Sequence, residues 1–169
     1  MYRKTFIEIN SENLKHNVKT LIKSFPDYKY YIGVFKGNVY GHGYEAIKPL
    51  VDAGINYFAV SCLEEALSVR KVSPESSILC LQPIHINDIP EAQKNNITIT
   101  ISSYEYFKQL ISTSIQGNLK VHLKINSGFN RLGISNEREV LEIVTTLKAS
   151  SNINLEGIFS HFATTGIYD

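Results

Sequence analysis

The chain alternates short apolar segments with longer amphipathic ones, and this alternation restricts the possible folds more than any other feature. The short segments predict strands at residues 30–36, 57–61, 78–82, 97–102, 120–126 and 155–162. The longer segments predict helices at residues 11–25, 46–54, 63–72, 86–95, 103–115 and 137–149. Strands that are apolar nearly throughout, each followed by a helix, are typical of parallel strands covered on both faces. The pattern therefore predicts an α/β fold.

Two architectures share this pattern, a doubly wound sheet and a (β/α)8 barrel. No Gly-rich dinucleotide fingerprint follows the strand at residues 30–36, where Lys36 occupies the turn instead. We therefore favour an α/β fold of the (β/α)8 TIM-type barrel class. Only about six of the eight βα units can be drawn, so the barrel is expected to be incomplete. Residues 5–10 alternate in the manner of a further, N-terminal strand.

Composition and charge exclude several kinds of partner. The 169 residues carry a formal net charge of +1, which gives no bias toward nucleic acid or an anionic membrane. No apolar segment approaches the roughly 20 residues that span a bilayer, and the first residues lack the apolar block of a signal peptide. Cys62 and Cys80 lack metal-ligand spacing. The sequence predicts a cytoplasmic protein that binds a small molecule and no metal.

Lys36 is the first candidate functional residue, because it ends the strand at residues 30–36. In a parallel α/β barrel, active sites are built at the carboxyl ends of the strands. A lysine held there against apolar walls is disfavoured in its charged form, so its amine becomes a better nucleophile toward carbonyl groups. Schiff-base chemistry is then expected. The alternative is a structural lysine that extends its ammonium group into solvent at a strand end.

The segment VFKGNVYGHG, residues 34–43, resembles the VxKxNxYGHG block of the alanine racemase family. The resemblance implies that Lys36 carries pyridoxal 5′-phosphate and is catalytic, and that Tyr40 contacts the phosphate side of this cofactor. Phe35, Gly37 and Val39 depart from the usual residues without removing a functional group. His42 we assign to the structure of the turn, because its glycine neighbours determine the shape of the backbone there.

A second block, VHLKINSGFNRLG at residues 121–133, ends a predicted buried strand and displays Arg131 beyond it. The planar fork of an arginine suits a phosphate, a carboxylate or a phenolate, although a solvated loop arginine is equally compatible with the local sequence. The block resembles the family's KxDTGMxRLG. The resemblance implies that Arg131 binds the cofactor's phenolic oxygen and the substrate, and that Lys124 is carbamylated. Asn126, Ser127 and Phe129 replace Asp, Thr and Met, and the lost carboxylate weakens the argument for carbamylation.

A third block, GIFSHFAT at residues 157–164, resembles the family's GxxTHFA. It implies that His161 lies beneath the cofactor ring as a contact rather than as a proton-transfer base. A lone histidine at a strand end is otherwise a hydrogen-bonded structural residue. LEEALSVR at residues 63–70 resembles a helix of the same family. The resemblance thus covers nearly the whole chain.

The function implied by the resemblance is that of a pyridoxal-phosphate-dependent racemase interconverting L- and D-alanine. This isomerase would serve D-alanine biosynthesis and supply a peptidoglycan precursor. The family's second base comes from a C-terminal β domain of the partner subunit, so we expect a homodimer of a longer enzyme and an inactive fragment. Residues 1–10 would pair with that missing domain, and residues 11–169 would form the partial barrel. Alternatives are a serine racemase, a non-catalytic pyridoxal-phosphate-binding barrel, and a structural half-barrel.

Overall fold

A computed structural model describes residues 5–165 of the chain. The strands are β1 Ile32–Val34, β2 Tyr57–Val60, β3 Ser77–Cys80, β4 Ile99–Ile101, β5 Leu119–Lys124 and β6 Ile153–Phe159. The helical segments are α1 Ser11–Ser24, α2 Gly37–Tyr40, η1 Tyr44–Ala46, α3 Ile47–Asp52, α4 Leu63–Val72, η2 Ile86–Asp88, α5 Ile89–Lys94, α6 Tyr104–Ser112 and α7 Glu137–Ala149. Over the described range, no helix is both long enough and apolar enough to cross a bilayer.

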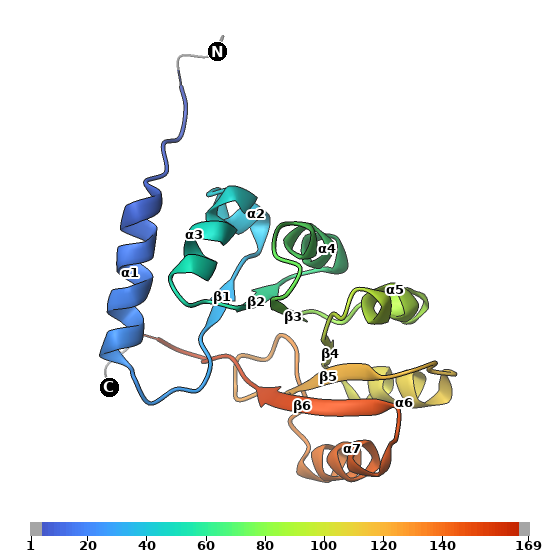
Figure 1. Cartoon of the computed structure of the whole chain (residues 1–169). Coiled ribbons are helices and arrows are strands. Elements are labelled where there is room, and N and C mark those ends of the chain that lie inside the picture. The colour runs from blue at the N-terminus through green and yellow to red at the C-terminus, as the bar shows by residue number, and fades with distance from the viewer. Residues whose placement is uncertain (1–4, 166–169) are drawn as a thin grey trace.

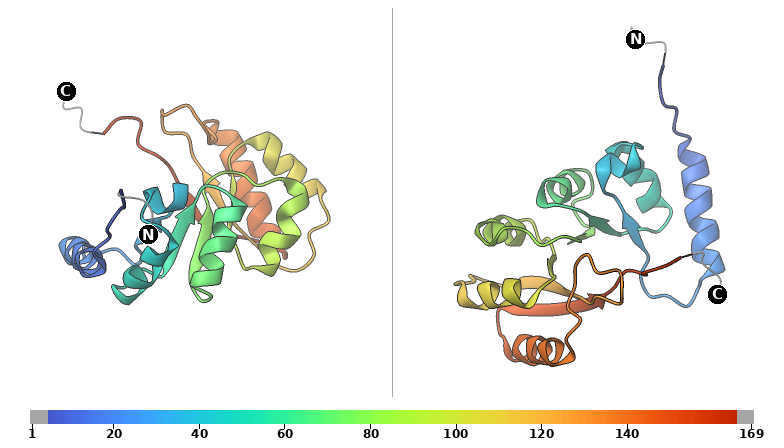
Figure 2. Two further views of the ribbon diagram at one scale, coloured as in Figure 1. Left: turned by 90° about the horizontal axis from the view of Figure 1, so that it is seen from above. Right: turned by 180° about the vertical axis from the view of Figure 1, so that it is seen from behind.

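The strands are parallel and follow one another in chain order around a curved surface. They form two three-stranded sheets, β1-β2-β3 and β4-β5-β6. A bridge between Leu79 and Thr98 joins the two sheets, and the main-chain N–H of Cys80 donates to the carbonyl of Thr98 at 2.9 Å. Helices α3 to α7 lie outside this surface (Figure 1 and Figure 2). The predicted parallel α/β fold is confirmed, and its curvature is consistent with an incomplete barrel.

Alternate positions of the strands supply the core between strands and helices. In β5, Val121 and Leu123 are fully buried, as is Ile143 on α7. Burial of an aliphatic side chain of this size contributes about 1.5–3 kcal/mol. His122 and Lys124 alternate with these residues and therefore project from the opposite face, where Lys124 lines a cavity. The hydrophobic pattern thus decides which side chains of β5 are presented to the inside of the barrel.

Polar side chains line the inside of the sheets on the amino-terminal side of that cavity. Nε2 of His122 lies 3.1 Å from Oη of Tyr57, and Oγ1 of Thr98 donates to Glu156 at 3.0 Å. A Cβ atom at Gly157 would come within 2.6 Å of the His122 ring, so β6 needs a glycine there. Burial lowers the pKa of His122, and the Glu156 carboxylate opposes this effect. These polar side chains therefore pack beneath the cavity, on its amino-terminal side, and the lowered pKa favours the neutral form of the His122 imidazole.

The predicted N-terminal strand does not form within the residues that the structure describes. Residues 5–10 form no strand, and Phe6 and Ile7 are 66 % and 76 % exposed. A strand exists only by pairing with another one, and this segment leads away from the sheets beyond α1 (Figure 1). Residues 1–4 of the same prediction lie outside the described range. Pairing with a C-terminal β domain therefore stays a prediction.

Candidate active site

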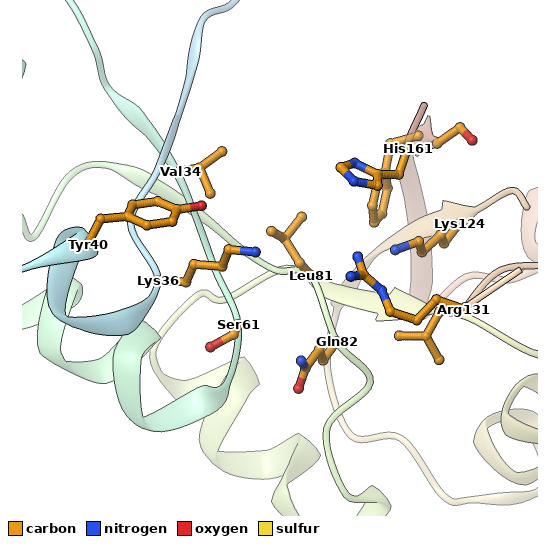
Figure 3. A pocket seen from close by; sticks show the side chains of 12 residues that line it. Val34, Lys36, Tyr40, Ser61, Leu81, Gln82, Lys124, Arg131 and His161 are labelled. Carbon is orange, nitrogen blue, oxygen red and sulfur yellow. The ribbon is translucent and has the colours of Figure 1, made fainter. Parts of the chain in front are cut away.

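A cavity of about 390 Å³ lies at the carboxyl ends of the strands. All the residues singled out from the sequence blocks line it, namely Lys36, Tyr40, Lys124, Arg131 and His161. Figure 3 shows Lys36 and Tyr40 reaching in from one side and the other three from the opposite side. Parallel strands place their carboxyl ends at one edge, which is why residues far apart in the chain meet here. The volume suits a small cofactor together with a small substrate.

Lys36 stands just beyond β1, as the sequence predicts, and the chain then makes a left-handed turn. The φ angles of residues 37–40 are 61°, 51°, 58° and 52°. The sequence predicts a turn at this place but not its hand, because non-glycine residues seldom adopt positive φ. Nζ of Lys36 lies 5.9 Å from the centre of the Tyr40 ring. The turn therefore directs both side chains into the same cavity.

Lys124 is nearly inaccessible, at 6 % exposure. Burial lowers the pKa of its ammonium group, and the positive charges of Arg131 and Lys36 lower it further. Among residues 5–165, no carboxylate forms an ion pair with Lys124. Its Nζ lies instead 5.4 Å from the centre of the Phe159 ring. Lys36, Lys124 and Arg131 thus face one cavity. Their combined positive charge favours an anionic ligand and lowers the pKa of Lys124.

Asn126 organises the loop that carries Arg131. Its side-chain oxygen accepts hydrogen bonds from the main-chain N–H groups of Gly128 at 3.1 Å and Asn130 at 3.0 Å. The guanidinium carbon of Arg131 lies 4.7 Å from the centre of the Phe129 ring. Stacking of this kind orients a planar cation without neutralising it. The residue that replaces the family's aspartate therefore shapes the loop and leaves the charge of Arg131 available.

His161 lies at the rim of the cavity, on the chain that follows β6. The strand ends at Phe159 instead of the predicted residue 162, so His161 stands on a loop rather than at a strand end. Its ring meets Phe129 edge-on, with centroids 5.0 Å apart. The hydroxyl of Ser160 donates to the carbonyl of Ile125 at 2.9 Å and ties this loop to the end of β5. An exposed imidazole is thereby held next to the Arg131 loop.

Sequence reasoning missed several residues of the site. Ser61, Leu81 and Gln82 also line the cavity, and their positions just after β2 and β3 were the available signal. Glu65 lies behind the site and accepts a hydrogen bond from the N–H of Gly37 at 2.6 Å. The signal for Glu65 was its place in the LEEALSVR block at residues 63–70, which resembles a helix of the family.

These features define a parallel α/β protein, consistent with an incomplete barrel, with a lysine-centred, cationic ligand site at the carboxyl ends of its strands. The family model for the alanine racemase N-terminal domain matches residues 9–169. The chain therefore belongs to the alanine racemase family.

Individual relatives agree with this assignment. "Alanine racemase 1" of Bacillus subtilis (strain 168) is 35 % identical over 164 residues, which are 96 % of this chain and 42 % of the relative. The crystal structure of alanine racemase from Bacillus anthracis with bound L-Ala-P superposes with a TM-score of 0.87 at 31 % identity, covering 96 % of this chain and 43 % of that one. A histidine racemase from Leuconostoc mesenteroides subsp. sake gives a TM-score of 0.86 at 26 % identity, with 96 % and 44 % covered. The chain thus spans less than half the length of these relatives.

Pyridoxal 5′-phosphate is the cofactor of this family, and the side chains of the cavity fit it. A primary amine on Lys36 matches its aldehyde, and the guanidinium of Arg131 matches its negative charge. Within the described part of the chain, no group of three or more His, Cys, Asp or Glu side chains is placed to hold a metal ion. The amine of Lys36 and the guanidinium of Arg131 suit an organic anion.

Proposed function

We propose that this chain is the cofactor-binding part of a pyridoxal-phosphate-dependent racemase that interconverts L- and D-alanine. The observation that carries the proposal is the convergence of Lys36, Tyr40, Lys124, Arg131 and His161 on one cavity. The family assignment supports the reaction class. Because the chain covers about 42 % of its relatives, the activity belongs to a longer enzyme, and the segment alone is inactive.

Each side chain of the cavity has a separate role in the proposed reaction. When bound, the cofactor supplies a conjugated ring that accepts the electrons left as the substrate's Cα proton departs. Lys36 anchors the cofactor and, once free as an amine, takes or returns that proton at Nζ on one face of the substrate. Arg131 stabilises negative charge at the phenolic oxygen and the substrate. Tyr40 contacts the phosphate side, and His161 contacts the ring.

Lys124 carbamylation is part of this proposal. A lysine with a lowered pKa is more often a neutral amine, and Lys124 combines such a shift with burial beside two cations. Its nitrogen can add to the carbon of CO₂, which forms an N–C bond and releases one proton. The resulting carbamate anion would pair with Arg131.

The rest of the enzyme has to supply what the described residues do not. A second base is needed on the opposite face of the substrate, since inversion requires proton removal and return from two sides. We place that base in a C-terminal β domain of a homodimer, whose sheet pairs with residues 1–10. The enzyme is then cytoplasmic and supports D-alanine biosynthesis for peptidoglycan.

Covalent labelling tests the anchor directly. We expect the complete protein with pyridoxal phosphate to absorb at about 420 nm, and borohydride reduction followed by peptide mapping to place the cofactor on Lys36. Lys124 is the internal control, because it lies in the same cavity. A label on Lys124, or no label, would show that Lys36 is not the anchor.

Substrate choice is tested by assay of the complete protein with bound pyridoxal phosphate, without borohydride reduction. A histidine racemase has a similar structure, so this fold occurs in racemases of more than one amino acid. We expect racemisation of alanine to exceed that of serine and histidine. Preference for serine would support the serine racemase alternative. Cofactor binding without exchange of the Cα proton of any amino acid would favour the non-catalytic barrel.

The Arg131→Lys substitution tests the role of the guanidinium. We expect turnover to fall by about tenfold or more with the cofactor still bound, because an ammonium group cannot reproduce the fixed planar fork. Steady-state kinetics and absorbance measure the two effects. Arg138→Lys on the exposed start of α7 is the control. Unchanged kinetics in Arg131→Lys would make Arg131 an ordinary loop residue.

A further inference from the structure

The turn that follows Lys36 is strained. Asn38, Val39 and Tyr40 all have φ between 51° and 58°, where the Cβ atom of an L-residue crowds the following carbonyl oxygen. A β-branched residue such as Val39 is especially unusual in this region. Such a conformation persists only where the surrounding structure holds it. The contacts that hold this turn therefore decide where the Lys36 side chain points.

One carboxylate connects the turn to the neighbouring strand. Glu65, in the first turn of α4, accepts the N–H of Gly37 on Oε1 at 2.6 Å. Its Oε2 accepts the N–H of Ser61 at 2.8 Å and the hydroxyl of Ser61 at 2.7 Å. Both oxygens are thus used, and they join the residue after Lys36 to the residue after β2. Gly37 and Ser61 belong to different βα loops, so this link is tertiary.

The contacts favour the ionised form of Glu65. The N–H groups of Gly37 and Ser61 can only donate, one to each carboxylate oxygen, and the Ser61 hydroxyl donates as well. Burial by itself would raise the pKa of Glu65, but hydrogen bonds from Ser61 and Gly37 and the charge of Lys36 hold it below its ordinary value. The carboxylate is therefore the resident form near neutral pH.

We propose that Glu65 is a positioning residue for Lys36, acting as a latch that fixes the left-handed turn through Gly37 and Ser61. The latch keeps the backbone of residues 36–40 in the conformation that sends both Lys36 and Tyr40 into the cavity. Glu65 does not line the cavity, so it acts through the backbone and not on substrate. The proposal rests on the proposed function for the identity of Lys36 as the anchor.

The Glu65→Gln variant tests the hydrogen bonds of Glu65 without changing the size of the side chain. An amide keeps the shape of the carboxylate but replaces one acceptor oxygen by a donor. Glu64→Gln, an exposed neighbour on the same helix, is the matched control. In the complete protein, we expect Glu65→Gln to label at Lys36 at least about tenfold more slowly with pyridoxal phosphate and borohydride. We expect kcat to fall similarly, with KM within about threefold.

Amide hydrogen exchange provides a measurement that needs no cofactor. Exchange at residues 37–41 should accelerate by about tenfold or more in Glu65→Gln and remain unchanged in Glu64→Gln. A general loss of stability would instead accelerate exchange across the core strands. If Glu65→Gln does not fold, Ser61→Ala provides a milder test, because it removes the hydroxyl that donates to Glu65. Labelling of Lys36 should then slow, and exchange at residues 37–41 should accelerate, by smaller factors.

The outcomes distinguish the latch from the anchor. Wild-type protein that carries no label on Lys36 overturns the proposed function, whereas the exchange at residues 37–41 still decides whether Glu65 holds the turn. The latch is overturned if the folded Glu65→Gln variant labels and exchanges at the wild-type rates. If Glu65→Gln does not fold, the same result in Ser61→Ala overturns it.

Discussion

Replacing Lys36 by alanine is expected to reduce racemase turnover of the complete protein by at least about a thousandfold. Two functions are lost together, since Lys36 is proposed both to anchor the cofactor and to move the Cα proton. Acid–base catalysis by one positioned group typically contributes about 10²–10⁴-fold, and covalent anchoring adds to it. Turnover is measured in both directions with L- and D-alanine. The absorbance at about 420 nm should disappear.

The control for this substitution is Lys48→Ala. Lys48 lies on α3 and is exposed, and it does not line the cavity. Its replacement should leave turnover and absorbance within about twofold of wild type, because surface substitutions away from special features change little. A Lys36→Ala protein that retained most of its turnover would remove the basis of the proposed function.

Replacing Arg70 by methionine is expected to lower the free energy of unfolding by about 3 kcal/mol or more. Its guanidinium donates to main-chain carbonyls of Pro74 at 2.6 Å, Ser76 at 2.7 Å, Asn95 at 2.9 Å and Asn96 at 3.0 Å. Hydrogen bonds from a charged donor contribute roughly 1.5–3 kcal/mol each. They are not additive, and methionine retains the apolar stem.

The physical reason for the size of this effect is the position of Arg70. It joins the end of α4 to the loop before β3 and to the loop after α5, so it holds two helix-to-strand connections together. Thermal unfolding should show Tm lowered by about 6–12 °C. Lys71→Met, at the exposed neighbouring position, should shift Tm by less than about 2 °C. Equal shifts in the two variants would show that the carbonyl contacts contribute nothing specific.

Features that depend on local sequence were predicted well. The positions of the parallel strands follow from apolar runs, and Lys36 ends its run within two residues of β1. Lys124 and Arg131 likewise come from one block at the end of β5. Since parallel strands bring their carboxyl ends to a common edge, local placement at a strand end was enough to predict that these residues meet. The sequence by itself therefore determined the fold class and most of the candidate site.

Only the tertiary structure decided the features that depend on contacts between distant segments. The left-handed turn after Lys36 is held by Glu65, 28 residues beyond Gly37. Gly37 and Asn38 tolerate positive φ, but no local propensity favours it at Val39 and Tyr40. The lowered pKa of Lys124 requires burial and two cations from other parts of the chain. Residues 5–10 carry a strand-like pattern, yet they form no strand, because alternation specifies a face but cannot provide a pairing partner.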